Sequence, residues 1–264
     1  MKKILALILA VLTIFVMAAC TTAETPEESA EPTEAAEATE APAEDITKKS
    51  EGVMTYAEYA AAEENTEVVI EAYVQNKQSW WDNKGTFYTQ DGDGAYFLYE
   101  MPCTEEEYNK LTAGTKIKVT GTKSSWKGEV EIINAAFEIE EGSYIAEAKD
   151  VTALLGTDEL INSMNQFVAF KGLTVVASTD GDGNEAAFLY NWDGSGDEGN
   201  DLYFKVSLGD ATYQLTVESY LCGADTDVYK AVKALEIGQK IDCEGFLYWY
   251  DGANPQITSV KVVG

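Results

Sequence analysis

The feature that most constrains the fold of this 264-residue chain is an internal repeat after residue 50. One signature consists of a Leu, a Gly three residues later and a Lys-Ile pair. It occurs at Leu111, Gly114, Lys116 and Ile117 and again at Leu235, Gly238, Lys240 and Ile241. An upstream match, residues 65–70 against 165–170, shows that the second copy carries an insertion of about 24 residues. The two copies are offset by 100 residues at the upstream match and by 124 residues at the signature. Solenoid units repeat at about 20 to 50 residues, so this longer period predicts two similar domains.

Within each copy, short segments alternate between apolar and polar residues. This is the pattern of half-buried β-strands, and turn-forming Asp-Gly and Lys-Gly pairs separate the segments. In the first copy the expected strands are 67–74, 95–99, 116–119 and 129–132. Short helices are expected at 56–64 and 105–111, and a third at 157–164 precedes the strands of the second copy. Five strands with a helix between the third and the fourth, in about 95 residues, predict an all-β fold of two five-stranded Greek-key barrels.

The residues of the fourth and fifth expected strands carry a family resemblance. The run from Leu111 to Gly121, followed by a hairpin and the segment 129–132, resembles OB-fold domains of the tRNA-anticodon-binding-like type. The chain is also similar to tandem OB-fold bacterial lipoproteins of uncharacterised function. The resemblance covers residues 51–264 and implies two barrels that bind an oligomer. Glycine, isoleucine and leucine at these spacings describe a barrel corner and a core, so the motif names no site.

The N-terminus predicts export and lipid anchoring. Lys2 and Lys3 precede an apolar run at 4–19 that is short for a membrane span, and Cys20 follows small residues as in a lipobox. We therefore expect a diacylglyceryl anchor on Cys20, at the extracytoplasmic face of the cell membrane. The predicted domains are a signal peptide at 1–20, a disordered acidic linker at 21–50, and OB-fold domains at 51–145 and 146–264.

Composition excludes several chemistries. The chain has 18 basic and 46 acidic residues, a net charge of −28, and neither Arg nor His. The absence of His excludes histidine-based triads and imidazole metal ligands, and the absence of Arg removes bidentate phosphate recognition. The acidic balance also disfavours nucleic acid as a partner, because nucleic-acid-binding domains usually present a basic face.

The loops at the expected ligand face of the first barrel combine aromatic and basic side chains. OB-folds bind ligands across strands two and three, between the loops that join strands one and two and strands four and five. Aromatic rings beside cations hold stacked ligands such as bases or sugars. The predicted ligand-binding residues are Lys77, Trp80, Trp81, Lys84, Lys123, Trp126 and Lys127. The alternative is that the lysines keep the loops soluble and the tryptophans close the barrel ends.

The second copy lacks these lysines, so the two barrels are not expected to share one ligand. Tyr248, Trp249 and Tyr250 form an aromatic surface there, or else pack in a core or an interface. Asp180, Asp182 and Asn184 have the spacing that begins a calcium loop, but Glu185 stands where the loop needs Gly. At most weak calcium binding is expected, and no other cofactor.

These observations favour a non-enzymatic, membrane-anchored protein of the cell envelope that binds a ligand through its barrels. The expected partners are the membrane and an extracellular glycan or a protein. Two alternatives are a nucleic-acid-binding OB-fold protein and an envelope glycan hydrolase. The hydrolase reading has only the abundance of carboxylates in its favour, because none stands in a recognisable pocket motif.

Overall fold

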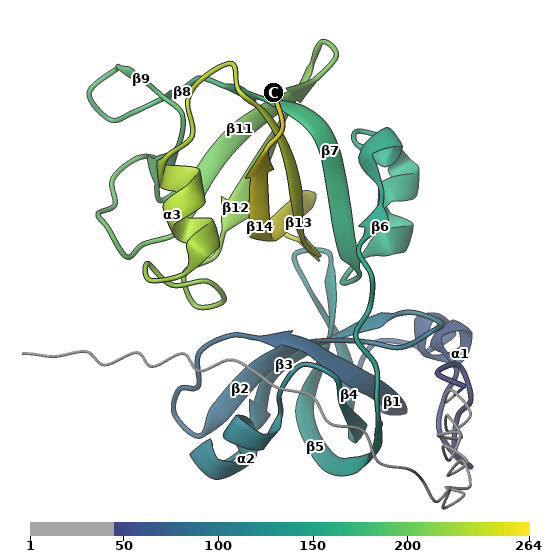
Figure 1. Ribbon diagram of the computed structural model, residues 1–264. Helices are drawn as coiled ribbons and strands as arrows, with labels where there is room; N and C mark the ends of the chain where they lie inside the picture. Colours follow the sequence, from purple (N-terminus) through teal and green to yellow (C-terminus); the bar gives the residue numbers. More distant parts are fainter. Residues whose placement is uncertain (1–44) are drawn as a thin grey trace, which may run out of the picture. The chain divides into compact units, whose positions relative to one another are not determined.

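The computed structural model describes residues 45–264, which belong to one compact unit. The predicted signal peptide with Cys20 and most of the predicted linker lie outside the described residues. The fold is all-β, with two five-stranded OB-fold barrels and few short helices, as predicted (Figure 1). No helix among residues 45–264 is long and apolar enough to cross a membrane.

The first barrel closes in the strand order β1-β2-β3-β5-β4. A parallel pairing of Phe97 with Glu131 and of Leu98 with Ile132 completes the circle, and the other strand pairs are antiparallel. Its elements are α1 (Tyr56–Ala61), β1 (Glu67–Lys77), β2 (Lys84–Gln90), β3 (Ala95–Pro102), α2 (Glu105–Lys110), β4 (Thr115–Trp126) and β5 (Glu129–Ser143).

The second barrel has the same strand order, built from β7, β11, β12, β14 and β13, and an antiparallel β7–β11 pairing closes it. The inserted residues lie between its first two strands and form the short strands β8 to β10. Its elements are β6 (Lys149–Asp150), the 3-10 helices η1 (Thr152–Leu154) and η2 (Asp158–Ser163), β7 (Phe167–Val176), β8 (Ser178–Thr179), β9 (Glu185–Ala186), β10 (Leu189–Tyr190), β11 (Leu202–Leu208), β12 (Ala211–Val217), α3 (Asp227–Lys233), β13 (Lys240–Trp249) and β14 (Ala253–Val262).

Matching backbone hydrogen bonds show that the repeat is structural. The amide of Asn65 donates to the carbonyl of Lys123 over 2.8 Å, and the amide of Asn165 donates to that of Leu247 over 2.9 Å. Both asparagines have a φ of 64°, a left-handed conformation that asparagine tolerates better than most residues. Lys123 and Leu247 therefore occupy equivalent positions in the two barrels.

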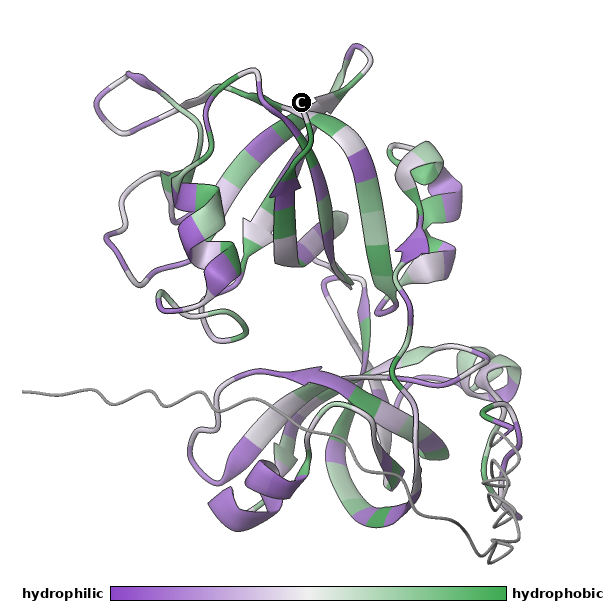
Figure 2. Cartoon of the chain, in the orientation of Figure 1, coloured by the Kyte–Doolittle hydropathy of each residue, from purple (hydrophilic) through white to green (hydrophobic). Residues whose placement is uncertain are grey.

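The three predicted helices differ in how well the local sequence supports them. Thr55 and Glu58 form a reciprocal capping box at the start of α1, and Thr104 and Glu107 do the same for α2. The segment 157–164 forms the 3-10 helix η2, which has no side-chain cap. Helix α2 buries no residue, and Figure 2 shows it as mostly hydrophilic.

A bulge bends the fourth strand of the second barrel at Gly245. A Cβ at this position would lie 2.1 Å from the carbonyl oxygen of Gln256, so only glycine allows β13 and β14 to approach this closely. Gly121, the equivalent residue in β4, also stands at a register shift. The repeated glycine therefore marks a corner of each barrel.

Candidate functional site

The outer face of β2 and β3 is covered by the second barrel. Tyr88 of β2 and Phe97 of β3 are at most 2% exposed and form a third hydrophobic cluster with Phe246 of β13. The rings of Tyr88 and Phe246 are stacked with centroids 4.3 Å apart, and the hydroxyl of Tyr88 donates to Gln256 Oε1 over 2.8 Å. The usual ligand face of an OB-fold is thus closed in the first barrel.

A buried carboxyl group lies in the same contact between barrels. Glu129 is fully buried, and its two oxygens accept hydrogen bonds from Asn165 Nδ2 (2.6 Å) and from the amide of Trp249 (2.8 Å). Burial raises the pKa of Glu129 to about 8, although both hydrogen bonds act to lower it. The group is therefore largely protonated near neutral pH.

Three of the predicted first-barrel site residues support the fold. The indole of Trp80 packs on the core and donates to the carbonyl of Cys103 over 3.0 Å. The ammonium of Lys77 donates to the carbonyl of Tyr108. Lys123 is 7% exposed, and its Nζ donates to carbonyls at the end of α1. Lys123 is thus buried and Lys77 and Trp80 are half-buried, and the polar groups of all three bond to backbone carbonyls of the protein.

The other four predicted residues are accessible but do not form one site. Trp81 is 72% exposed and shares a pocket with Lys84, whereas Trp126, at the end of β4, is 58% exposed and does not line that pocket. Lys127 turns to the second barrel, where its Nζ lies 2.9 Å from Asp251 Oδ2. The first-barrel loops therefore divide their aromatic and basic groups between two places.

The predicted aromatic surface of the second barrel also divides. Tyr248 packs against Phe97 in the contact between barrels. Trp249 covers Gly128 of the first barrel, where an added Cβ would lie 2.7 Å from its ring, and it lines a pocket on the second barrel. Tyr250, 50% exposed, faces a different pocket. Three consecutive aromatic residues thus have three different environments.

The ligand face of the second barrel is open and carries a groove of about 620 Å³, here called the β11–β12 groove. It combines the four structural elements that bind ligands in OB-folds. Tyr203 comes from the second barrel strand, Gln214 from the third, Trp192 from the inserted first loop and Tyr250 from the last hairpin. Ala253 and Asn254 complete the lining.

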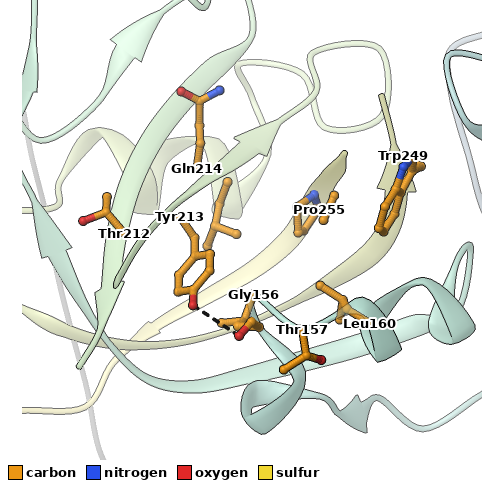
Figure 3. Close-up of a pocket in the computed structure, with 11 residues that line it drawn as sticks. Gly156, Thr157, Leu160, Thr212, Tyr213, Gln214, Trp249 and Pro255 are labelled. Atoms are coloured by element: carbon orange, nitrogen blue, oxygen red, sulfur yellow. Dashed lines mark hydrogen bonds between the residues drawn. The ribbon is translucent and has the colours of Figure 1, made fainter. Parts of the chain in front are cut away.

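A second pocket of about 380 Å³ adjoins this groove, since Gln214 and Ala253 line both (Figure 3). In Figure 3, Tyr213 and Gln214 point in opposite directions from β12, as neighbouring residues of a strand do. The hydroxyl of Tyr213 donates to the carbonyl of Leu155 over 3.2 Å, which ties β12 to the segment before η2. The lining of this second pocket is mostly apolar.

The charges around the β11–β12 groove are mixed. Lys205 follows Tyr203 on the outer side of β11 and pairs in register with Gln214. Burial, with the negative charges of Asp201 and Glu218, raises the pKa of Tyr203 to about 12, so its phenol stays neutral and can stack or donate a hydrogen bond. Burial also raises the pKa of Glu218 to about 7. The groove is thus an aromatic and polar surface with little positive charge.

The predicted calcium residues form a turn. One oxygen of Asp180 accepts from the amides of Asp182 and Asn184 over 3.0 and 2.8 Å. Among residues 45–264, no group of three or more acidic, Cys or His residues is placed to hold a metal ion. The Asp-x-Asp-x-Asn spacing therefore reflects an Asp-capped turn.

The groove residues Trp192, Tyr203, Gln214 and Asn254 were missed by the sequence analysis. A usable signal was present, because Tyr203, Lys205 and Ser207 alternate with buried Leu202, Phe204 and Val206 in β11. An aromatic residue at an outward-facing position of a strand, next to a long insertion, indicates a ring that solvent or a ligand can reach. The predicted site residues were lysines and aromatic residues of expected loops, so Tyr203, which lies on a strand, was not among them.

No protein-family model matches the chain, and no curated protein is similar to it in sequence. Solved structures are similar at low levels. One is a murine DNA-binding protein bound with double-stranded DNA (12% identity, TM-score 0.34, covering 74% of this chain and 96% of that one). Another is the single-stranded DNA-binding protein from Thermus aquaticus (10% identity, TM-score 0.25, covering 76% of this chain and 95% of that one).

These comparisons correct the predicted function and partners. The predicted binding of an extracellular glycan or a protein, with nucleic acid disfavoured, is contradicted by them, because the similar structures are described as DNA-binding. The alternative reading, a nucleic-acid-binding OB-fold protein, is the one that agrees with them.

Proposed function

We propose that the chain binds single-stranded nucleic acid in the β11–β12 groove of the second barrel. The observation that carries the proposal is the convergence of three rings, Trp192, Tyr203 and Tyr250, from three different elements of one open OB face. Unpaired bases stack on such rings whatever their sequence, and each stacked base contributes about 1 to 3 kcal/mol. The polar groups of Gln214 and Asn254 between the rings can hydrogen-bond base edges.

The proposed activity is binding without catalysis. A duplex is a poor ligand for this groove, because its bases are already stacked and its binding depends on phosphate contacts. Lys205 pairs in register with Gln214, and Lys127 Nζ lies 5.8 Å from the ring centroid of Tyr250 but is already paired with Asp251. Stacking therefore has to supply most of the affinity. The predicted anchor at Cys20 and the predicted location remain predictions, and the proposed function does not depend on them.

Fluorescence anisotropy with a labelled oligothymidylate of about 16 nucleotides tests the proposal. Trp192→Ala should raise the dissociation constant about 5-fold to 150-fold, the equivalent of 1 to 3 kcal/mol. The matched control is Trp126→Ala, because Trp126 stands in the hairpin position of the first barrel that Tyr250 occupies in the second, beside a covered face. The proposal fails if the oligonucleotide does not bind, or if both variants bind it equally.

Salt dependence separates this mode from phosphate recognition. A protein that neutralises many phosphates loses about a thousandfold or more in affinity between 50 and 200 mM salt. With one or two lysines at the groove and a net charge of −28, the change here should stay below about tenfold. A steep loss of affinity with salt would place the ligand at a basic surface and not in this groove.

A further inference from the structure

A second aromatic pocket, of about 440 Å³, lies where the first long loop of barrel one meets the end of β12. Its three rings are exposed to solvent: Trp81 is 72% exposed, Tyr220 68% and Tyr99 42%. Gln78 and the Lys84–Glu100 ion pair, with N and O 2.8 Å apart, supply polar groups beside the rings. Neither barrel alone provides this set of residues.

The backbone holds these rings in place. Trp81 and Lys84 exchange two backbone hydrogen bonds across Asp82 and Asn83, whose φ values of 48° and 58° are those of a type I′ hairpin turn. The amide and hydroxyl of Ser79 both donate to the carbonyl of Tyr220, over 2.7 and 3.1 Å. Tyr220 is therefore fixed against the loop of the first barrel, although its ring stays exposed.

The pocket is also close to the β11–β12 groove along the chain. Gln214, which lines the groove, precedes Tyr220 by six residues, so an extended chain places them at most about 20 Å apart. Burial, and then the negative charges of Asp201 and Glu218, raise the pKa of Tyr203 in the groove. Glu218, two residues before Tyr220, therefore lies near the groove. A single strand that fills the groove and continues past the end of β12 would reach the pocket.

We propose that the Trp81–Tyr99–Tyr220 pocket is a second base-stacking subsite, which takes further nucleotides of the strand held in the β11–β12 groove. The proposal rests on the proposed function and extends it to a strand that spans both barrels. The occupant is an unpaired base, because three exposed rings beside an amide and a neutralised ion pair suit a planar, polar-edged group better than an isolated phosphate.

Binding of labelled oligothymidylates from about 4 to about 16 nucleotides tests this subsite. For the longest strand, Trp81→Ala and Tyr220→Ala should each weaken binding about 5-fold to 150-fold, with one strand bound per chain. For the shortest strand the same variants should change the affinity by less than about twofold, because three groove rings leave few bases for the pocket. Trp126→Ala, which removes an exposed ring outside both pockets, is the control.

The outcomes distinguish this inference from the proposed function. If the longest strand binds Trp81→Ala and Tyr220→Ala as tightly as the original chain, while Trp192→Ala still weakens it, the second subsite is wrong and the groove stands. If two long strands bind per chain, the pocket is a separate site and the inference is also wrong. If no oligonucleotide binds, the proposed function fails first. Thermal melting of each variant checks that removing these exposed rings leaves the stability of the fold unchanged.

Discussion

The two barrels have the same strand order, but the equivalent face is covered in the first barrel and open in the second. In the first barrel, Tyr88 and Phe97 on β2 and β3 are buried under the second barrel. In the second, Tyr203 and Gln214 on the equivalent strands β11 and β12 line an open groove. A duplicated fold can thus use one copy of a face for assembly and keep the other for a ligand. The residue types agree with this division, because aromatic rings of the first barrel meet aromatic rings of the second across the contact.

The largest expected effect comes from breaking the covered face. Phe246→Ala removes a ring that is 2% exposed and stacked on Tyr88, so it should cost about 3 to 5 kcal/mol of unfolding free energy. Trp192→Ala, on the open face, should change stability by no more than about 0.5 kcal/mol, since the ring is 72% exposed. Urea unfolding of both variants measures the difference. Equal losses would mean that the faces are not used differently.

The next effect concerns the buried carboxyl group between the barrels. The pKa of Glu129 in the folded chain, about 8, lies above its ordinary value, so folding favours the protonated form. The associated stability is complete below about pH 4.5 and is lost as pH rises through 8. Because each pKa unit corresponds to about 1.4 kcal/mol, the loss should amount to a few kcal/mol. Unfolding free energies measured from pH 5 to pH 9 should show it.

Glu129→Gln is the control for that titration. The amide keeps an acceptor for Asn165 or Trp249 but cannot ionise, so the decline in stability between pH 5 and pH 9 should flatten. Glu218, with a pKa raised to about 7, contributes in the same direction and leaves a smaller slope. An unchanged slope in the variant would assign the pH dependence to another group.

The fold was predictable from sequence because the determining signals are local and repeated. The capping boxes at Thr55 and Thr104 each act within a few residues. The corner glycine also acts locally, and the repeat contains it twice, as Gly121 and as Gly245. The 157–164 segment was the exception. It forms a 3-10 helix, and it has no side-chain cap.

The site was harder to predict because its position depends on which face is covered. One signal was available: Ala95, Tyr96, Phe97 and Leu98 in β3 are apolar at every position, and all are buried. A strand that is apolar without alternation is covered on both faces, whereas the prediction treated it as half-buried. That reading would have placed the ligand on the second barrel. The burial of Lys123 could not be inferred, because lysines rarely point inward.

A smaller effect tests the equivalence of Lys123 and Leu247. Lys123→Leu gives the first barrel the residue of the second, and the carbonyls of Tyr59, Ala60 and Ala62 then lose their shared donor. The expected loss is about 1 to 3 kcal/mol, the cost of leaving buried acceptors unpaired. Thermal melting with circular dichroism measures it. A more stable variant would contradict the prediction and show that these carbonyls do not need the Lys123 donor.

The smallest expected effect lies where the two last hairpins meet. Lys127 Nζ and Asp251 Oδ2 are 2.9 Å apart, but the side chains are 43% and 60% exposed. Solvent screens such a pair, so a double-mutant cycle of Lys127→Ala and Asp251→Ala should give a coupling of about 0.2 to 1 kcal/mol that shrinks at high salt. The backbone bond from the amide of Asp251 to the carbonyl of Lys127, over 2.7 Å, survives both substitutions. A coupling well above 1 kcal/mol would mean that the hairpins, and not the ring contacts of the covered face, hold the barrels together.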